Sequence, residues 1–274
     1  MLTVVAYHDI TSANCFEQQM RYFSNNYTFV TADRVEDSIY GNGALPDKAL
    51  LITFDDAYPS VYTAALPVLI KYNVPAIVFT ITSLVGTTQP YWWDEVMYYL
   101  PSTMDEPQRK AKLWEIKDWS TAERVSFVND LRANSQKPTL KRTQLTWEQL
   151  REMEKNNVVI ANHSHTHPLL HVTSKDQIEK ELIAASNLLL QHGLSGSRIF
   201  AYPNGNSSPV AEELMRTHSF TMSFLFDHRI QKEIDHPYRI SRLSLDTRSP
   251  LIKTKLIMRG WHSQYLNLRN KLVR

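Results

Sequence analysis

Short apolar runs alternate with amphipathic stretches along most of the chain. Residues 49–54 read ALLITF, and similar runs lie at 2–6 and 76–80. These runs contain too few polar positions to alternate, which is typical of strands covered on both faces, as in a parallel sheet. Helical spacing follows in stretches such as 61–72 and 174–192. This rhythm of strand, helix and strand predicts right-handed crossovers and an α/β fold.

The rhythm is interrupted once, by residues 87–147. This stretch has helical and aromatic character and opens with the residues YWW at 91–93. The rhythm then resumes, with a helix capped by Thr146. Further strands are expected at 27–30, 158–161, 198–202, 220–226 and 238–245, and further helices at 16–25, 147–155 and 208–217. Because no repeat or flexible linker marks a boundary, we expect one domain over 1–274 with a helical insertion at about 87–147.

Composition sets bounds on the kind of protein. The 274 residues are enough for one large α/β barrel or two modest domains, and the apolar content of 43% can fill a sizeable core. A net charge of +2 gives no argument for a nucleic-acid partner. Cys15 is the only cysteine, so no intrachain disulfide can form.

The chain as given shows no targeting segment. Residues 1–7 have no basic lead and read as a first strand, and no run approaches the roughly 18 apolar residues that a bilayer span requires. We therefore expect a cytoplasmic protein without a transmembrane segment. An exported or envelope-associated location stays open, because a removed leader would leave no trace in this sequence.

Chemically capable residues follow several of the expected strands. Asp55 and Asp56 come directly after 49–54, and His163 and His167 follow 158–161. The residues PNG at 203–205 follow another strand. An α/β barrel displays its site at the carboxyl ends of its parallel strands, so these residues are expected at one mouth.

The residue types in this pattern indicate a hydrolytic metal site. Two adjacent carboxylates repel unless a cation lies between them, in which case one can bind the ion and the other can act as a base. His163 and His167 are four residues apart, a spacing that puts both rings on one side of a turning segment, while His165 should face away. One carboxylate and two imidazoles leave a position open for water, as catalytic zinc requires. The competing interpretations are an acidic turn that caps the next helix and a polar loop that is rich in histidine.

Several motifs resemble those of a known family. TFDD at 53–56, HSHTHP at 163–168 and FAYPNG at 200–205 are similar to the first three motifs of the NodB-homology polysaccharide deacetylases, carbohydrate esterase family four. YHDI at 7–10 resembles the start of many bacterial members, and the likeness covers roughly residues 1–250. The resemblance implies a distorted (β/α) barrel of seven to eight strands. It also implies hydrolysis of N-acetyl groups on the amino sugars of a glycan or glycan precursor.

The resemblance also assigns roles to the matching positions. Asp56, His163 and His167 would hold a divalent metal, with zinc favoured, and Asp55 would be the general base. In the family's mechanism a backbone N–H helps to bind the tetrahedral oxyanion. Here the turn formed by Tyr202, Pro203 and Asn204 would supply it, through the amide of Asn204.

Two departures from the family pattern lie next to the carboxylate pair and in the third motif. Ala57 follows the carboxylate pair where the family usually has glycine, and Ala201 stands where the family has an arginine that steadies the base. Arg239 or Arg242, on the expected strand 238–245, could supply that charge. The alternative for either residue is an ordinary surface or structural arginine without a role in the site.

A third departure concerns the proton donor. The late motif that ends a strand in a catalytic histidine is missing, because the residues LSL at 243–245 are followed by Asp246. An acid must protonate the leaving amine, since an amide anion is a poor leaving group. His8 has the best expected position, at the end of the first strand, and His228, His236 and His262 are further candidates. The sequence therefore leaves the catalytic acid unassigned.

Three functions follow from these observations. The first is a metal-dependent N-deacetylase whose partner is a carbohydrate with N-acetylated amino sugars. The second is a metal-dependent hydrolase of another C–N bond on the same scaffold, and the third is a degenerate barrel that binds carbohydrate without turnover. The sequence names neither the glycan nor the oligomeric state.

Overall fold

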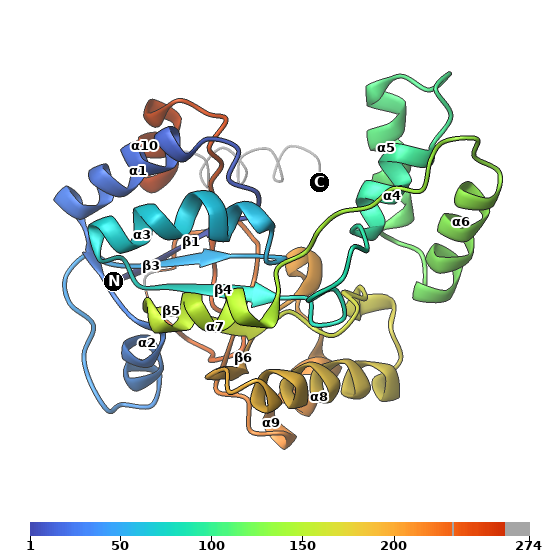
Figure 1. Cartoon of the computed structure of the whole chain (residues 1–274). Coiled ribbons are helices and arrows are strands. Elements are labelled where there is room, and N and C mark those ends of the chain that lie inside the picture. Colours follow the sequence, from blue (N-terminus) through green and yellow to red (C-terminus); the bar gives the residue numbers. More distant parts are fainter. Residues whose placement is uncertain (232, 261–274) are drawn as a thin grey trace, which may run out of the picture.

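The computed structural model describes residues 1–231 and 233–260, which form an α/β barrel (Figure 1). The eight-stranded sheet has the order β7-β6-β5-β4-β3-β1-β8, with β2 paired to β3 beside this path, and all strand pairings are parallel. The strands are β1 (Leu2–Tyr7), β2 (Thr28–Phe29), β3 (Ala49–Phe54), β4 (Ala76–Thr80), β5 (Val158–Asn162), β6 (Gly196–Ala201), β7 (Met222–Phe224) and β8 (Leu243–Ser244). The distorted (β/α) barrel predicted from the sequence is confirmed.

Helices cover the outer side of the curled sheet (Figure 1). They are α1 (Ala13–Asn26), α2 (Ala32–Ile39), α3 (Leu66–Tyr72), α7 (Trp147–Lys155), α8 (Lys175–Gln191), α9 (Pro209–Thr217) and α10 (Leu251–Met258), and a π-helical turn η1 (Val61–Ala65) leads into α3. Helix α1 shows the principle, since it buries Phe16, Met20 and Phe23 at intervals of three and four residues. Within the described ranges, none of the helices combines the length and the apolar character that a bilayer span demands.

The barrel closes through residues 240–244, and this closure is irregular. Ile240 forms an isolated parallel bridge to Phe224 at the end of β7, while β8 pairs with β1. The strand predicted over 238–245 is therefore too long, because regular pairing is confined to β8. Between the two contacts Arg242 turns inward and is completely buried, so the chain leaves the ladder to place a charged side chain inside the barrel.

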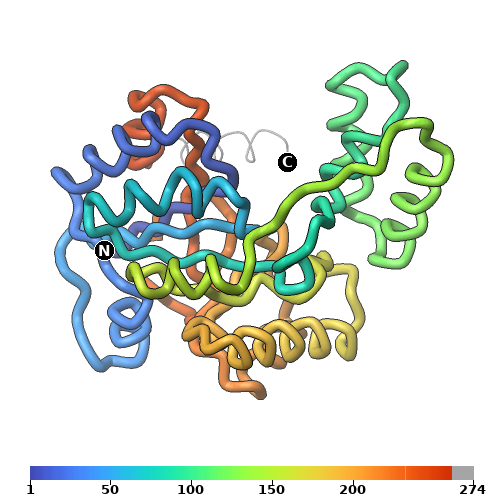
Figure 2. The backbone as a smooth tube through the Cα atoms, viewed as in Figure 1, coloured from blue at the N-terminus to red at the C-terminus, as the bar shows by residue number. Residues whose placement is uncertain are grey.

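The helical insertion, which comprises α4 (Trp92–Tyr99), α5 (Glu106–Ile116) and α6 (Thr121–Ala133), stands apart from the barrel on the side to which β3 and β4 point (Figure 1). In Figure 2, two single stretches of chain connect these helices to the rest. The helices bury a small cluster of their own, which contains Val96, Leu100, Ile116 and Val128. The insertion therefore lies over the mouth of the barrel where the carboxyl ends of the strands meet.

Candidate active site

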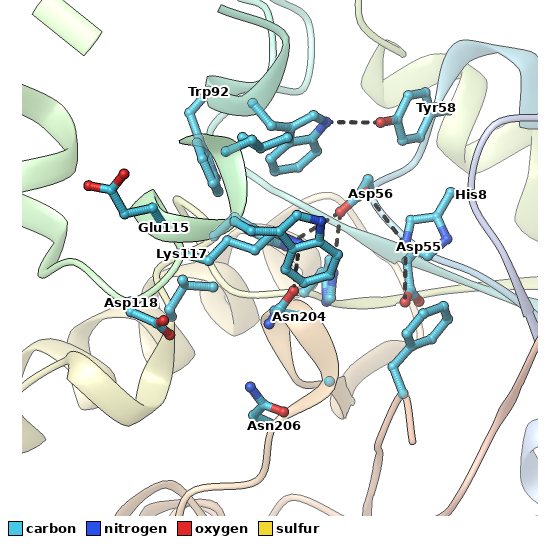
Figure 3. Close-up of a pocket in the computed structure, with 18 of the residues that line it drawn as sticks. His8, Asp55, Asp56, Tyr58, Trp92, Glu115, Lys117, Asp118, Asn204 and Asn206 are labelled. Atoms are coloured by element: carbon cyan, nitrogen blue, oxygen red, sulfur yellow. Dashed lines mark hydrogen bonds and ion pairs between the residues drawn. The ribbon is translucent and has the colours of Figure 1, made fainter. Parts of the chain in front are cut away.

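Two strands bring the expected metal ligands together at this mouth. Asp56 follows β3, while His163 and His167 follow β5. One ligand atom from each of the three lies within 4.8 Å of the others, and all three side chains are buried. They line a cavity of about 800 Å³, which Figure 3 shows with Asp55 and His8 on one side of Asp56 and Lys117 on the other.

Both loops that carry these ligands contain left-handed backbone. The φ angle is 65° at Asp56, 51° at Ala57 and 59° at His167. A left-handed conformation costs a non-glycine residue about 1–2 kcal/mol, so the surroundings must hold it. The Tyr91 hydroxyl donates to the Asp56 carbonyl at 3.1 Å, and the His167 N–H donates to Ser164 Oγ at 3.0 Å. The angle at Ala57 also explains why glycine suits that position in the family.

The ring nitrogens are oriented for binding a cation. His163 Nδ1 lies 2.9 Å from the carbonyl oxygen of Ala201, so Nδ1 carries the proton and Nε2 presents its lone pair. The Nε2 atoms of His163 and His167 lie 3.3 and 3.6 Å from Asp56 Oδ1. That oxygen is buried and lacks a hydrogen-bond partner among the described residues. One carboxylate and two imidazoles converging on an unsatisfied oxygen fit a divalent ion such as zinc.

The charges in the site also favour a cation. Of the two buried carboxylates, Asp55 pairs with the Arg242 guanidinium, whereas within the described part of the chain the ion pairs of Asp56 are with histidines only. Burial alone lowers the pKa of His163, but contact with Asp56 and the charge of Asp55 outweigh it, and the pKa rises. Burial lowers the pKa of His167 to about 3, so this ring is neutral at pH 7. A proton on His163 therefore offsets part of the negative charge of Asp55 and Asp56, and a bound metal ion could offset that charge in its place.

Asp55 is held by Arg242 in a bidentate ion pair. The Arg242 Nη1 and Nη2 atoms donate to the two carboxylate oxygens at 2.7 and 2.9 Å, and Nε donates to the Leu225 carbonyl at 2.6 Å. Burial raises the pKa of Asp55, but the charges of Arg242, His163 and His8 outweigh it and lower the pKa. Arg239 instead pairs with Glu212, so Arg242 is the arginine that lies where the family's missing charge is needed.

The histidines considered as proton donors occupy different places. His8 lines the cavity, with its Nε2 3.9 Å from Asp55 Oδ2 and 4.0 Å from Asp56 Oδ2. His228 also lines the cavity, and its ring packs against Phe226. His236 accepts from the backbone N–H of Tyr238 and does not line the cavity, and His262 lies outside the described residues.

The turn after β6 brings one of its three expected residues to the cavity. Asn204 lines the cavity, with φ at 60°. Gly205 follows with φ at 78°, and a Cβ there would collide with the backbone of Phe226. Pro203 is buried, and Tyr202 lies in the core with its hydroxyl donating to the Tyr238 carbonyl at 3.1 Å. Of this turn, therefore, only Asn204 among the expected residues can meet a ligand.

The helical insertion also contributes residues to the cavity. Lys117, just after α5, donates to Asn204 Oδ1 at 2.8 Å, and Trp114 on α5 lines the same cavity. Trp92 and Trp93 line it too, and the Trp93 ring lies against His167 with centroids 4.9 Å apart. No local sequence signal marks Lys117, because its partner is 87 positions away.

Comparisons with known proteins agree with this geometry. The sequence model for the family described as "Polysaccharide deacetylase" matches residues 42–223, which is well over half of the chain. The poly-beta-1,6-N-acetyl-D-glucosamine N-deacetylase of Escherichia coli strain K12 is 36% identical over 63 residues, which are 23% of this chain and 9% of that protein. The matches span a third or less of the length of the curated relatives.

Two solved structures share the fold. The Streptococcus pyogenes deacetylase PplD, in complex with acetate, has a TM-score of 0.68 and 17% identity, covering 94% of this chain and 97% of that one. IcaB from Ammonifex degensii has a TM-score of 0.65 and 25% identity, covering 89% and 91% of the two chains. The likeness therefore extends from the matched motifs to nearly the whole barrel.

Proposed function

Because the chain belongs to the polysaccharide deacetylase family, we propose that it is a metal-dependent hydrolase that removes N-acetyl groups from amino sugars of a glycan. The observation that carries the proposal is the buried set of Asp56, His163 and His167, whose ligand atoms lie within 4.8 Å of one another. These three residues would hold the ion. A divalent ion there would act as a Lewis acid, polarising the acetamide carbonyl and acidifying a water molecule.

Asp55 is the proposed general base. Its lowered pKa keeps it ionised at neutral pH, so it can accept the proton of the attacking water. The Arg242 guanidinium occupies both carboxylate oxygens and fixes the plane of the group. Arg242 is thus a positioning residue that acts through Asp55.

The donor to the oxyanion and the acid that protonates the leaving nitrogen follow other strands of the barrel. The backbone N–H of Asn204 is the proposed donor to the oxyanion that forms at the acetyl carbonyl oxygen when water adds to the carbonyl carbon. His8 is the proposed acid, because it lines the cavity within 4.0 Å of both carboxylates and can deliver a proton to the leaving nitrogen.

N-acetylglucosamine glycans are the proposed substrates. The Escherichia coli relative is named for poly-beta-1,6-N-acetyl-D-glucosamine, and it supports this class of substrate. The experiment that tests the function is a screen for acetate release from N-acetylglucosamine oligomers with β-1,4 and β-1,6 linkages, with added divalent metals. Bound metal without acetate from any amino sugar would favour hydrolysis of another amide bond instead.

We expect His163→Ala to abolish stoichiometric metal binding. Loss of residues that merely orient metal ligands lowers affinity about 10–100-fold, and loss of a ligand should cost more. Metal content after dialysis, measured by mass spectrometry, checks this. His165→Ala is the matched control, because its ring contacts Thr82 rather than Asp56 and the variant should keep the ion. Equal retention by the two variants would contradict the assigned ligands, and a wild-type protein without metal would favour a non-catalytic binding barrel.

We expect His8→Ala to slow acetamide hydrolysis by about 10²–10⁴-fold, the usual effect of losing a general acid. Hydrolysis of an aryl acetate should suffer far less, because a phenolate leaves without being protonated. The ratio of acetamide hydrolysis to aryl acetate hydrolysis is measured in His8→Ala and in His228→Ala, and the variant in which this ratio falls identifies the acid. A selective loss on the amide in His228→Ala alone would assign the role to His228.

A further inference from the structure

The Trp114 side chain is unusually exposed for a large apolar residue that lines a cavity. Its exposed fraction of 65% is the highest among the large apolar side chains of the described residues, yet it lines the cavity that holds the proposed metal ligands. Helix geometry explains the exposure. Ile116 is fully buried in the insertion's own cluster, and a residue two positions earlier on a helix points to nearly the opposite side. The fold therefore turns an indole toward the mouth of the barrel.

Lys117 fixes this indole relative to the reaction centre. Its ammonium lies 4.3 Å from the centroid of the Trp114 ring and donates to Asn204 Oδ1 at 2.8 Å. One side chain thus contacts both the aromatic surface and the turn that carries the proposed oxyanion donor. A ring held in this way is preorganised, because little freedom remains to be lost on binding.

The surroundings of Trp114 match a sugar better than a lipid chain or a flat apolar peptide. Glu115, Lys117 and Asp118 line the same part of the cavity, and Figure 3 shows these three on the side away from His8. A hydrocarbon ligand would cover these charges without giving them hydrogen bonds, which is costly. A pyranose offers hydroxyl groups to the charges and an apolar face to the indole, as aromatic platforms require.

The size of the cavity indicates more than one ring. Its volume of about 800 Å³ lies near the upper end of the roughly 300–1,000 Å³ range of ligand pockets. Asp56 lines this cavity from the barrel and Trp114 lines it from the insertion, so both parts of the fold face the same ligand.

We propose that Trp114 and Lys117 form a sugar-binding subsite beside the reaction centre, which makes these two residues of the insertion determinants of the preference for longer oligosaccharides. This inference rests on the proposed deacetylase function for the identity of the neighbouring group. The indole binds a ring next to the one that carries the acetamide, and Lys117 sets the distance between the two.

Chain-length dependence of turnover tests the subsite. The quantity is the ratio of kcat/KM for the N-acetylglucosamine tetramer to that for the monomer, measured with β-1,4 and β-1,6 linkages. The wild-type protein should favour the tetramer, and Trp114→Ala should lower the ratio about tenfold, as expected for loss of an aromatic contact. Trp114→Phe should recover part of the preference, because it keeps an aromatic face. Leu190→Ala is the control, since Leu190 is 52% exposed on α8 and does not line the cavity.

Two results would overturn the subsite: a wild-type protein that does not distinguish tetramer from monomer, and an unchanged ratio in Trp114→Ala. If the wild-type protein releases no acetate at all, the proposed function fails and the subsite is judged by calorimetric titration with the same sugars. Tetramer binding that is weakened about tenfold in Trp114→Ala but not in Leu190→Ala would then support it. Identical binding by the three proteins would refute it.

Discussion

Replacing Asp55 with asparagine should lower the rate of acetate release by about 10²–10⁴-fold while the protein keeps its metal. The amide has nearly the same shape as the carboxylate but cannot take a proton from water at neutral pH. Asp56, His163 and His167 are untouched by the change, so the affinity for the ion should fall little. The loss should therefore appear in kcat with the metal content preserved.

The measurement combines acetate release with metal content and thermal unfolding of the same preparation. Asp33→Asn is a suitable control, because it removes an exposed carboxylate on α2 at a distance from the cavity. Full activity in Asp55→Asn would exclude Asp55 as the base. Loss of metal together with activity would instead assign Asp55 to ion binding.

Replacing Arg242 with methionine should destabilise the protein by about 3–5 kcal/mol, because it leaves the buried Asp55 carboxylate without its partner. The change should also raise the pKa of Asp55, since burial raises it and Arg242 is the strongest of the charges that oppose burial. The base would then be protonated up to a higher pH. We therefore expect the acidic limb of the activity profile to move to higher pH.

The same lowered pKa links stability to pH. An Asp55 carboxylate with a pKa below its ordinary value of 3.8 stabilises the fold above that pH, and this contribution disappears as the pH falls through the lower folded-state value. In Arg242→Met this contribution should be missing from denaturant unfolding curves measured at pH 7.

Arg151→Met is the matched control for this prediction. Arg151 also pairs with a carboxylate, that of Glu148, but the two side chains are 39% and 76% exposed. Exposed ion pairs contribute about 0–1 kcal/mol, so its loss should barely change stability or the pH profile. Similar effects in the two variants would show that the buried pair has no special role.

The residues of the reaction centre could be predicted because each of them lies directly after a strand that the neighbouring sequence defines. The run at 49–54 is apolar throughout and forms β3 with the predicted bounds, so the position of the Asp55–Asp56 pair follows from where the strand ends. His163 and His167 share one loop for the same reason. Their convergence on Asp56 follows from the parallel order of β3, β4 and β5.

Residues whose positions depend on partners far away in the sequence could not be predicted in this way. In the stretch 238–245 the alternation of apolar and polar residues breaks at Ser241 and Arg242, where the chain leaves the ladder, but nothing local names the carboxylate partner of Arg242 187 positions earlier. Lys117 likewise meets Asn204 across 87 positions. A long-range ion pair outweighs local strand propensity here, and periodicity does not identify the partner.

The position of Arg242, directly before the last strand of the barrel, also sets when a newly made molecule becomes active. The ribosome releases residues from the amino terminus onward, so Asp55 emerges long before the segment that closes the barrel. Until that segment arrives, the emerging polypeptide has an aspartate without its guanidinium and a sheet that is open between β7 and β1. We expect nascent and truncated products that lack residues 240–244 to be inert, so that catalytic competence begins only after the last strand of the barrel has been made.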